Sequence, residues 1–436
     1  MTTAAPARPA ATPPSAGARD RFLDLVRLAA MVLVVAQHWL LPMLVLDGAA
    51  VVPERADVLA HLWPATWVTQ VMPLVFFTSG AATVLSLRGR AVPDGAWVSR
   101  RLVRLVGGLV VLAAVWLPLP PVLLAAGLDP ELVSVGGRMI GGLLWFLVVL
   151  VLLTVLTPVL LRVVDRCRGV EIGVLAAAAV GIDVLRFGLG WEEAGYVNAV
   201  LVWAAVHALG MHAARGRLAR LHGRCAALVG LAGVAALGLL VVLGPYPAAM
   251  IGLPGTTVSN MNPPSAALLA LAVGQVGLLH ALRGPLTRLV ERPVVAAAVD
   301  RWVPHTMAVY LWHTPAAVVV ATGMVALGVE GHPVGSAGWW LMVPVWLLGS
   351  GAVLALSVAA TRRFALRGSG VTGRRLVGGA ALVVLGVLAL TVSGFDPARL
   401  PALHGPLVAT WALVAGALLL GARPAGAPGR RTGMVA

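Results

Sequence analysis

The chain carries very little charge for its length. Of its 436 residues, 11% are charged and 59% are hydrophobic, and the mean hydropathy is +0.93. A soluble globular domain of this composition could not cover its surface with polar groups, so that class is excluded. Apolar runs of about 20 residues satisfy their backbone polar groups by crossing a membrane as helices. The composition therefore predicts an all-α polytopic membrane protein.

Lysine is absent and cysteine is rare. All 32 basic residues are arginines, and the formal net charge is +15. In a soluble protein this charge would favour nucleic-acid binding, but here the arginines cluster in short loops between apolar runs, which is typical of a topology signal. Cys167 and Cys225 both fall in predicted inner loops, where thiols stay reduced, and neither has metal-ligand spacing. We therefore expect no nucleic-acid partner, no disulfide and no metal site.

Twelve apolar runs are predicted to span the bilayer. With the N-terminus in the cytoplasm, the loops alternate in arginine content and only four arginines fall on the outer side. This pattern predicts a multi-pass protein of the cell (plasma) membrane with both termini in the cytoplasm. Residues 1–20 are predicted to be a disordered cytoplasmic tail, and residues 422–436 a second cytoplasmic tail. The predicted spans lie near residues 23–46, 66–87, 102–126, 139–161, 171–189, 195–213, 226–244, 264–282, 303–327, 337–359, 376–393 and 404–421.

The first predicted span carries three ionisable residues on one face. At about 100° per residue, Arg27 and His38 differ by roughly 20° around the helix, and Asp24 lies within about 60° of both. Charges in hydrocarbon are costly, so such residues normally face a bundle interior and mark a functional path. A guanidinium near the cytoplasmic end can bind a phosphate, and a neutral imidazole about 16 Å further along can take a proton from a hydroxyl. The structural alternative is that Arg27 extends to the headgroups and His38 bonds a neighbouring helix.

Other polar residues in the predicted spans are assigned structural roles. Ser79 stands beside Gly80, which favours close helix packing over nucleophilic chemistry. Asp183 and Arg186 are one helical turn apart and are expected to pair with each other. Three histidines near inner ends are also expected to be structural: His207, His212 and His280.

Five short motifs, in order along the chain, resemble those of the membrane-bound acyltransferase family 3. The first span resembles that family's opening helix, in which ten residues separate an arginine from a histidine. The later motifs resemble its Phe-Phe-x-x-Ser-Gly (here Phe-Phe-Thr-Ser-Gly), Arg-x-x-Arg, Trp-Phe-Leu and Tyr-Leu-x-His-x-Pro segments. The matching residues are Asp24, Arg27, Ala30 and His38; Phe76, Phe77, Ser79 and Gly80; Arg101 and Arg104; Trp145, Phe146 and Leu147; and Tyr310, Leu311, His313 and Pro315.

The resemblance implies a fold and an activity. It covers roughly residues 21–365 and implies a ten-helix acyltransferase-3-like transmembrane domain. Residues 366–421 add an inner loop and two more apolar runs without any of the motifs, so we expect them to be dispensable for the chemistry. The implied reaction moves an acyl group, commonly acetyl, from cytoplasmic acyl-coenzyme A to a hydroxyl of a glycan, lipid-linked or small-molecule acceptor. No permanently bound cofactor is implied.

The resemblance also implies roles for individual residues. Arg27, Arg101 and Arg104 would hold the donor at the inner mouth, because guanidinium groups bind phosphates bidentately. His38 would be the general base or a transient acyl acceptor. His313 could orient His38, bind the acceptor, or only form a hydrogen bond inside the bundle. The supporting residues would be Asp24, Ser79, Trp145 and Tyr310.

A twelve-span secondary transporter is the alternative function, with Asp24 and His38 in a proton relay. Against it, no two halves of the chain match each other, and the polar residues concentrate in the first span. A non-enzymatic membrane scaffold is a third possibility, but it leaves the buried Arg27 and His38 unexplained. Binding or exchange of labelled acetyl-coenzyme A separates the enzyme from both alternatives.

Overall fold

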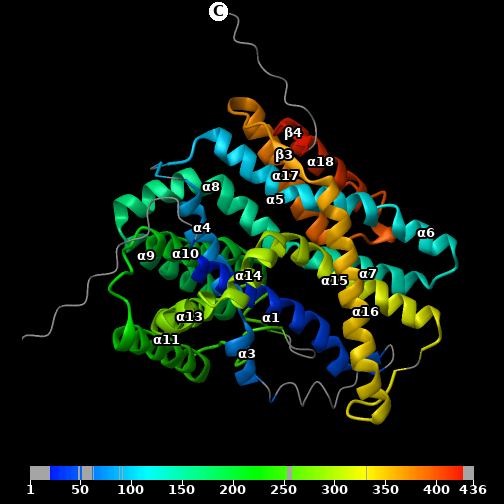
Figure 1. Cartoon of the computed structure of the whole chain (residues 1–436), viewed down its shortest axis with the longest axis horizontal. Coiled ribbons are helices and arrows are strands. Elements are labelled where there is room, and N and C mark those ends of the chain that lie inside the picture. The colour runs from blue at the N-terminus through cyan, green and yellow to red at the C-terminus, as the bar shows by residue number, and fades with distance from the viewer. Residues whose placement is uncertain are drawn as a thin grey trace, which may run out of the picture.

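The computed structural model shows a helical protein with two small two-stranded sheets (Figure 1). It describes residues 20–47, 50, 51, 61, 63–87, 89, 90, 92–252, 258–329 and 331–425. The predicted N-terminal tail up to residue 19 and the C-terminal tail from residue 426 lie outside the described residues.

The helices and strands follow one another along the chain, and the segment between α11 and α12 is a long connection. Strand β1 pairs antiparallel with β2, and β3 pairs antiparallel with β4. The elements are α1 (Arg21–Val45), β1 (Leu46–Asp47), β2 (Ala50–Val51), α3 (Trp63–Thr69), α4 (Met72–Ser86), α5 (Gly95–Trp116), α6 (Leu119–Ala125), α7 (Pro130–Gly142), α8 (Trp145–Cys167), α9 (Val170–Asp183), the π-helical η1 (Val184–Gly188), the 3-10 helix η2 (Glu192–Val197), α10 (Asn198–Ala214), α11 (Gly223–Leu243), α12 (Ala267–Ala281), α13 (Arg283–Val290), α14 (Pro293–Trp302), η3 (Val303–His305), α15 (Thr306–Ala326), α16 (Ala337–Thr361), η4 (Arg362–Phe364), β3 (Leu366–Gly368), α17 (Gly373–Ser393), η5 (Pro397–Arg399), α18 (Pro406–Leu419) and β4 (Ala422–Pro424).

The helical membrane architecture is confirmed, but the count of twelve spans is not. Within the described ranges, nine helices are long and apolar enough to cross a membrane, or ten if α12 and α13, which meet at a 62° bend, form one broken span. The two other predicted spans correspond to α9 with η1, a run that carries Glu171, Asp183 and Arg186, and to α18, which has 14 residues.

Several helix starts follow from local chemistry. The carboxylate of Asp94 accepts a hydrogen bond from the backbone nitrogen of Trp97 at 2.7 Å and caps α5. Ser336 caps α16 in the same way through the backbone nitrogen of Trp339. Such caps satisfy N–H groups that have no partner in the first turn of a helix. The cap at Asp94 fixes where α5 begins, and with it the position of the arginines in its first turns.

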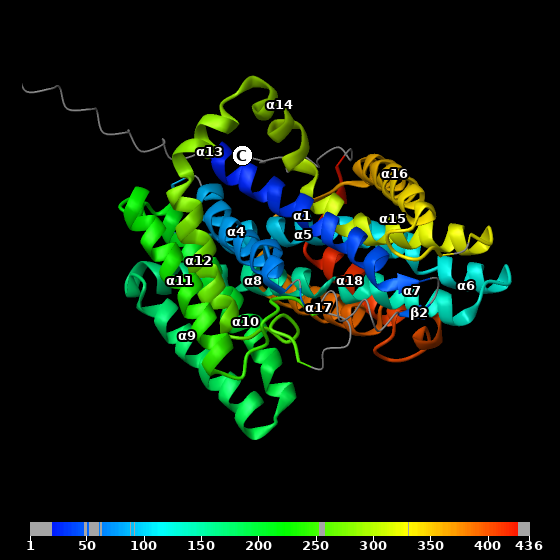
Figure 2. The ribbon, with the colours of Figure 1, turned by 90° about the horizontal axis from the view of Figure 1, so that it is seen from below.

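Helix α1 lies in the middle of the bundle, where it packs against both α4 and α15 (Figures 1 and 2). Its exposed side chains include Val32 and Leu40. Asp24 is buried, and Arg27 and His38 are partly buried. The three ionisable residues therefore share the inward face of α1, as their spacing predicts.

The short helices α13 and α14 hold the N-terminal end of α1. Arg21 forms an ion pair with Asp300 of α14 at 3.0 Å, and Arg283 of α13 forms one with Asp20 at 3.0 Å. Apolar side chains of α1 also pack against a small cluster around Val299. These contacts place the N-terminal end of α1, which carries Arg21 and Arg27, beside the arginine-bearing helices α13 and α14.

Helices α17 and α18 belong to the same core as the rest of the bundle. α17 packs against α7 and α8, and α18 packs against α5. The Ser99 hydroxyl of α5 donates a hydrogen bond to the carbonyl oxygen of Leu420 at 2.8 Å. Fully buried Val383 and Leu413 belong to one hydrophobic cluster with Leu102 of α5. The two added helices therefore support the helix that carries Arg101 and Arg104, and their dispensability for the chemistry stays a prediction.

We predict that Gly386→Ala destabilises the protein, whereas Gly378→Ala on the same helix does not. A Cβ at Gly386 would lie 2.8 Å from the backbone nitrogen of Leu413 and 2.9 Å from the carbonyl oxygen of Ala409, so α17 and α18 would have to separate. Such overpacking costs about 1–3 kcal/mol, more than the gain of about 1 kcal/mol in helix propensity. At Gly378 the nearest atom is a flexible leucine methyl at 3.9 Å. The measurement is the thermal midpoint in detergent, and equal midpoints for the two variants would contradict the packing described.

Candidate active site

His38 of α1 and His313 of α15 meet in the interior of the bundle. The Nε2 atom of His313 lies 2.9 Å from Nδ1 of His38, and the ring centroids are 5.0 Å apart. His313 is fully buried, and its Nδ1 lies 2.6 Å from the carbonyl oxygen of Tyr310. The hydroxyl of Thr314 approaches Nε2 of His313 at a longer 3.3 Å. The first and ninth predicted spans thus contribute their histidines to one site.

The hydrogen bonds determine which nitrogen carries each proton. A carbonyl oxygen only accepts, so Nδ1 of His313 must donate to Tyr310, and Nε2 of neutral His313 then has a lone pair. Nδ1 of His38 must donate to that lone pair. Neutral His38 is left with a lone pair on Nε2, and no described residue forms a hydrogen bond with that atom.

Two tryptophans hold the backbone around the histidine pair. The indole nitrogen of Trp39 donates to the carbonyl oxygen of His313 at 2.9 Å. The indole nitrogen of Trp346, on α16, donates to the carbonyl oxygen of Trp39 at 2.9 Å. Both indoles are buried, so α1, α15 and α16 are joined at the level of the pair.

A cavity of about 290 Å³ lies beside His38. Its walls come from α1, the start of α4, the start of α8, α15 and the loop that precedes α12. Most of the lining is apolar, and the polar side chains are few. They are Gln37, His38, Gln70, Trp145 and Tyr310.

The three predicted donor-binding arginines gather near the N-terminal ends of α1 and α5. The guanidinium of Arg101 donates to the Thr83 hydroxyl of α4 at 3.2 Å and lies 5.1 Å from the ring centroid of Trp97. Arg27 and Arg104 lie close enough to Arg101 to act on it electrostatically. Three like charges in one place repel each other, and a bound anion would relieve that repulsion.

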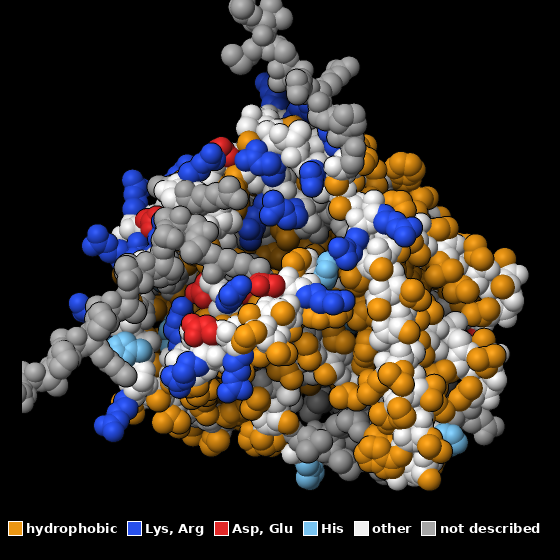
Figure 3. All heavy atoms as spheres, in the orientation of Figure 1, with side chains coloured by type: hydrophobic (Ala, Val, Ile, Leu, Met, Phe, Trp, Pro, Cys, Tyr) orange, Lys and Arg blue, Asp and Glu red, His pale blue; other side chains and the backbone are white. Residues whose placement is uncertain are grey.

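Figure 3 shows arginine side chains gathered at the top and left of one face of the molecule, while apolar side chains dominate its lower right. Arg27 also forms an ion pair with Asp24 of the same helix at 3.8 Å. Asp24 therefore lies against the arginine that the sequence assigns to donor binding.

Near Arg101 lie buried nitrogen atoms without a hydrogen-bond partner among the described residues. They are Nε of Arg101 and both ring nitrogens of His207, on α10. His207 lies close enough to Arg101 for the guanidinium charge to act on its ring. Buried polar groups are rarely left unpaired, and an unpaired group often points to a bound ion, water or ligand. The structural role expected for His207 stays a prediction.

Ser79 lies at a close helix contact rather than beside the histidine pair. Next to it, a Cβ on Gly80 would collide with the carbonyl oxygen of His207, so α4 and α10 approach backbone to backbone. Gly210 of α10 makes the reciprocal approach to the carbonyl oxygen of Phe77. Small residues at such contacts let membrane helices pack closely.

Asp183 and Arg186 do not form the pair that their spacing predicts. Arg186 forms an ion pair with Glu192 at 2.9 Å and donates to the carbonyl oxygens of Ser259 and Pro263. Asp183 instead accepts from the hydroxyl of Tyr246, the backbone nitrogen of Ala266 and the side chain of Asn198. Both residues anchor the segment between α11 and α12, which contributes part of the cavity wall.

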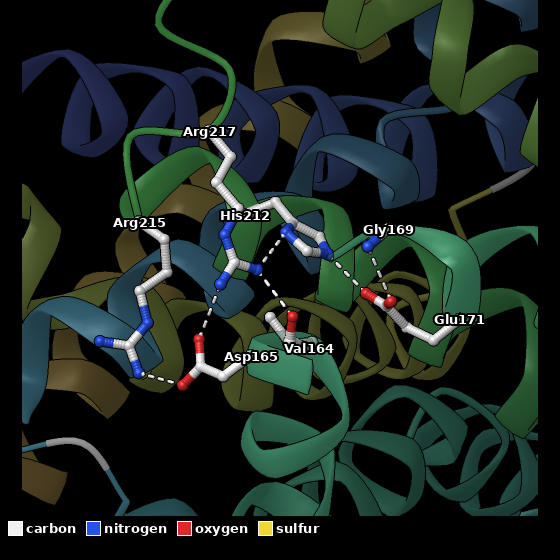
Figure 4. A network of polar contacts seen from close by, with 7 residues as sticks. All are labelled: Val164, Asp165, Gly169, Glu171, His212, Arg215 and Arg217. Atoms are coloured by element: carbon white, nitrogen blue, oxygen red, sulfur yellow. Dashed lines mark hydrogen bonds and ion pairs between the residues drawn. The ribbon is translucent and has the colours of Figure 1, made fainter. Parts of the chain in front are cut away.

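His212 lies in a network of polar contacts that joins α8, α9 and α10 (Figure 4). Its Nε2 lies 2.5 Å from Oε1 of Glu171, and its Nδ1 lies 2.8 Å from a guanidinium nitrogen of Arg217. Arg217 and Arg215 both form ion pairs with Asp165. Every member has a partner, as a structural role for His212 predicts.

Comparison with known families identifies the chain. The model of the acyltransferase family 3, described as an acyltransferase domain, matches residues 20–362, most of the chain. The chain belongs to this family. Comparisons with curated proteins and with solved structures gave no match. Membership of this family supports membrane acyltransferase activity for the chain. The predicted resemblance to the family is confirmed.

In this acyltransferase, the predicted site residues fall into two groups. His38, His313, Tyr310 and Trp145 lie at or beside the cavity. The arginines form the second group with Asp24, nearer the N-terminal ends of α1 and α5. Ser79 belongs to neither group.

Sequence reasoning missed four residues of the site. Trp39 and Trp346 hold the histidine backbone, Gln37 lines the cavity, and His207 lies near Arg101. The positions of Gln37 and Trp39 on either side of His38 were the available signal. Trp346 and His207 reach the site only through contacts between helices that are distant in sequence.

We predict that His212→Ala lowers the thermal midpoint, because buried Glu171 loses its imidazole partner. Removing one partner of a buried polar group costs about 1–3 kcal/mol. His222→Ala is the matched control, since His222 is exposed and its side chain caps no helix. A His212→Ala variant as stable as this control would show that the network contributes nothing to stability.

Proposed function

We propose that this acyltransferase moves an acyl group, most simply acetyl, from cytoplasmic acyl-coenzyme A to a hydroxyl of a glycan, lipid-linked or small-molecule acceptor. It would act in the plasma membrane with both termini in the cytoplasm. Family membership favours this reaction over proton-coupled transport by Asp24 and His38. The observation that carries the proposal is that Nε2 of His38, beside a cavity, forms no hydrogen bond with any residue that the structure describes.

The histidine pair supports proton transfer by His38. As the acceptor oxygen attacks the thioester carbon, Nε2 of His38 takes the hydroxyl proton. The C–S bond then breaks, and the imidazolium returns the proton to the leaving thiolate, which gives an ester and free coenzyme A. A two-step route through acyl-histidine would use the same lone pair. His313 orients the ring of His38 in both routes and accepts the hydrogen bond of its Nδ1–H.

The arginine cluster supports donor binding at the inner mouth. Coenzyme A is polyanionic and cytoplasmic, and guanidinium groups bind phosphate through paired hydrogen bonds. Arg27, Arg101 and Arg104 would bind the phosphates, and Asp24 would orient Arg27. Nε of Arg101 and the single N–H of neutral His207, which have no hydrogen-bond partner among the described residues, offer further donors to oxygen atoms of the donor. The thioester would then point along α1 towards His38.

The remaining predicted residues would have supporting roles. Tyr310 and Trp145 line the cavity next to His38 and would shape the acceptor site. Tyr310 also supplies the carbonyl oxygen that fixes the tautomer of His313. Ser79 would act only by allowing α4 to approach α10.

His38→Ala should reduce turnover by about 10²–10⁴ if the imidazole transfers a proton, and by more if it carries the acyl group. Binding of acyl-coenzyme A should persist, because the arginine cluster is intact. The measurements are transfer of labelled acetyl and equilibrium binding of acetyl-coenzyme A by the same purified preparation. Near-normal turnover in a folded variant would rule out His38 as the base.

Arg101→Ala and Arg104→Ala should each raise the KM for acyl-coenzyme A about tenfold or more, since a hydrogen bond to a charged group contributes about 1.5–3 kcal/mol. Lysine should restore binding only in part, because it lacks the planar fork of donors. Arg166→Ala removes an exposed charge from the inner end of α8 and should leave the KM unchanged. Equal KM values for all three alanine variants would place the donor site elsewhere.

A further inference from the structure

The polar side chains of the cavity beside His38 are mostly occupied by protein contacts. The hydroxyl of Tyr310 donates to the carbonyl oxygen of Leu143 at 2.5 Å. The side-chain nitrogen of Gln70 donates to the carbonyl oxygen of Met250 and to the sulfur of Met261, both at 3.0 Å. The side-chain oxygen of Gln70 accepts from the backbone nitrogen of Met72. Neither Tyr310 nor Gln70 has its main polar donor free for a ligand.

Three polar side chains of the lining have atoms that form no hydrogen bond with any described residue. They are Nε2 of His38, the amide of Gln37 and the indole N–H of Trp145. The side-chain nitrogen of Gln37 is buried and has no hydrogen-bond partner among the described residues. Gln37 precedes His38 on α1, so an unpaired donor lies next to the proposed base in sequence and lines the same cavity.

The rest of the lining is apolar and comes from several elements. It includes Met31 and Val34 of α1, Val75 of α4, Phe146 of α8 and Met261 of the outer loop. Pockets that bind small molecules combine such walls with a few placed polar groups. A hydroxyl buried against these walls without a partner would weaken binding. A sugar carries a hydroxyl on most of its carbons, and this cavity can pair only a few.

We infer that this cavity is the acceptor site, and that the part of the acceptor it binds is apolar and carries few hydroxyls. This inference rests on the proposed acyl transfer and selects among its acceptors. Nε2 of His38 would receive the proton of one hydroxyl, and the amide of Gln37 would donate to the oxygen of that hydroxyl or to a neighbouring carbonyl. A hydroxylated membrane lipid and a small hydrophobic alcohol share this chemistry, and a free glycan does not.

The first test measures binding without the donor. Radiolabelled cyclohexanol and radiolabelled glucose are equilibrated with the purified full-length protein in lipid nanodiscs. Val34→Phe fills the cavity, since Val34 is 7% exposed and lines it; Val32→Phe puts the same side chain on the outward face of α1, where Val32 is 59% exposed. Saturable binding of cyclohexanol that Val34→Phe removes and Val32→Phe keeps supports the inference. Saturable binding of glucose with the same dependence on Val34, or no saturable binding of cyclohexanol, overturns it.

The second test measures transfer from labelled acetyl-coenzyme A. Cyclohexanol should be esterified at least about tenfold faster than glucose at equal concentration, because each unpaired buried hydroxyl weakens binding. Gln37→Leu should raise the KM for the alcohol about tenfold, the loss expected for one buried hydrogen bond, and should not change the KM for acetyl-coenzyme A. Faster esterification of glucose, or an unchanged KM for the alcohol in Gln37→Leu, overturns the inference while leaving acyl transfer intact. Failure to bind acetyl-coenzyme A overturns the proposed function itself.

A third experiment distinguishes an acceptor that is a membrane lipid from one that is a soluble alcohol. In native membranes with labelled acetyl-coenzyme A and no added alcohol, label in the lipid extract that Val34→Phe removes identifies a membrane lipid. Label that appears only after a soluble alcohol is added identifies a diffusing molecule. Label in isolated polysaccharide that persists in Val34→Phe overturns the inference.

Discussion

The hydrogen bond between His38 and His313 is the interaction on which the rest of the site depends. It joins α1 to α15 and belongs to a chain of hydrogen bonds that ends at the carbonyl oxygen of Tyr310. Because that carbonyl can only accept, Nδ1 carries the proton in neutral His313 and in neutral His38. Nε2 of His38 then keeps a lone pair and can act as a base. The indoles of Trp39 and Trp346 keep the two helix backbones at the separation that this chain requires.

The proposed reaction sets a second constraint, because its donor is polyanionic whereas the cavity beside His38 is mostly apolar. Arginine side chains gather at the top and left of the face shown in Figure 3, whereas the cavity beside His38 has a mostly apolar lining that includes the start of α4 and the loop before α12. Along α1, Arg27 and His38 are eleven residues apart, about 16 Å at 1.5 Å per residue. In the proposed reaction, α1 carries a contact to the donor near one end and a base near the other, and its packing against α4, α13, α14 and α15 sets its position.

Much of this arrangement could be predicted from the sequence, and the part that could not has a common cause. The inward face of α1 follows from helical periodicity, and the motifs on the later spans identify the family. Local spacing failed for Asp183 and Arg186, because Arg186 pairs instead with Glu192 and both residues also bind a loop more than 60 residues away. It also could not show that His38 and His313 touch, that Tyr310 is committed to Leu143, or that His207 approaches Arg101, since these are contacts between separate helices.

The tautomer of His38 is the most direct test of this account. Solid-state ¹⁵N NMR of the histidine-labelled protein in lipid bilayers, with the His38 signals assigned by their loss in His38→Ala, reports which ring nitrogen is protonated. The account predicts a neutral ring protonated on Nδ1, with an unprotonated Nε2. A neutral ring protonated on Nε2 would contradict it, because His38 would then have no lone pair facing the cavity and His313 could not hold it in the position of a base.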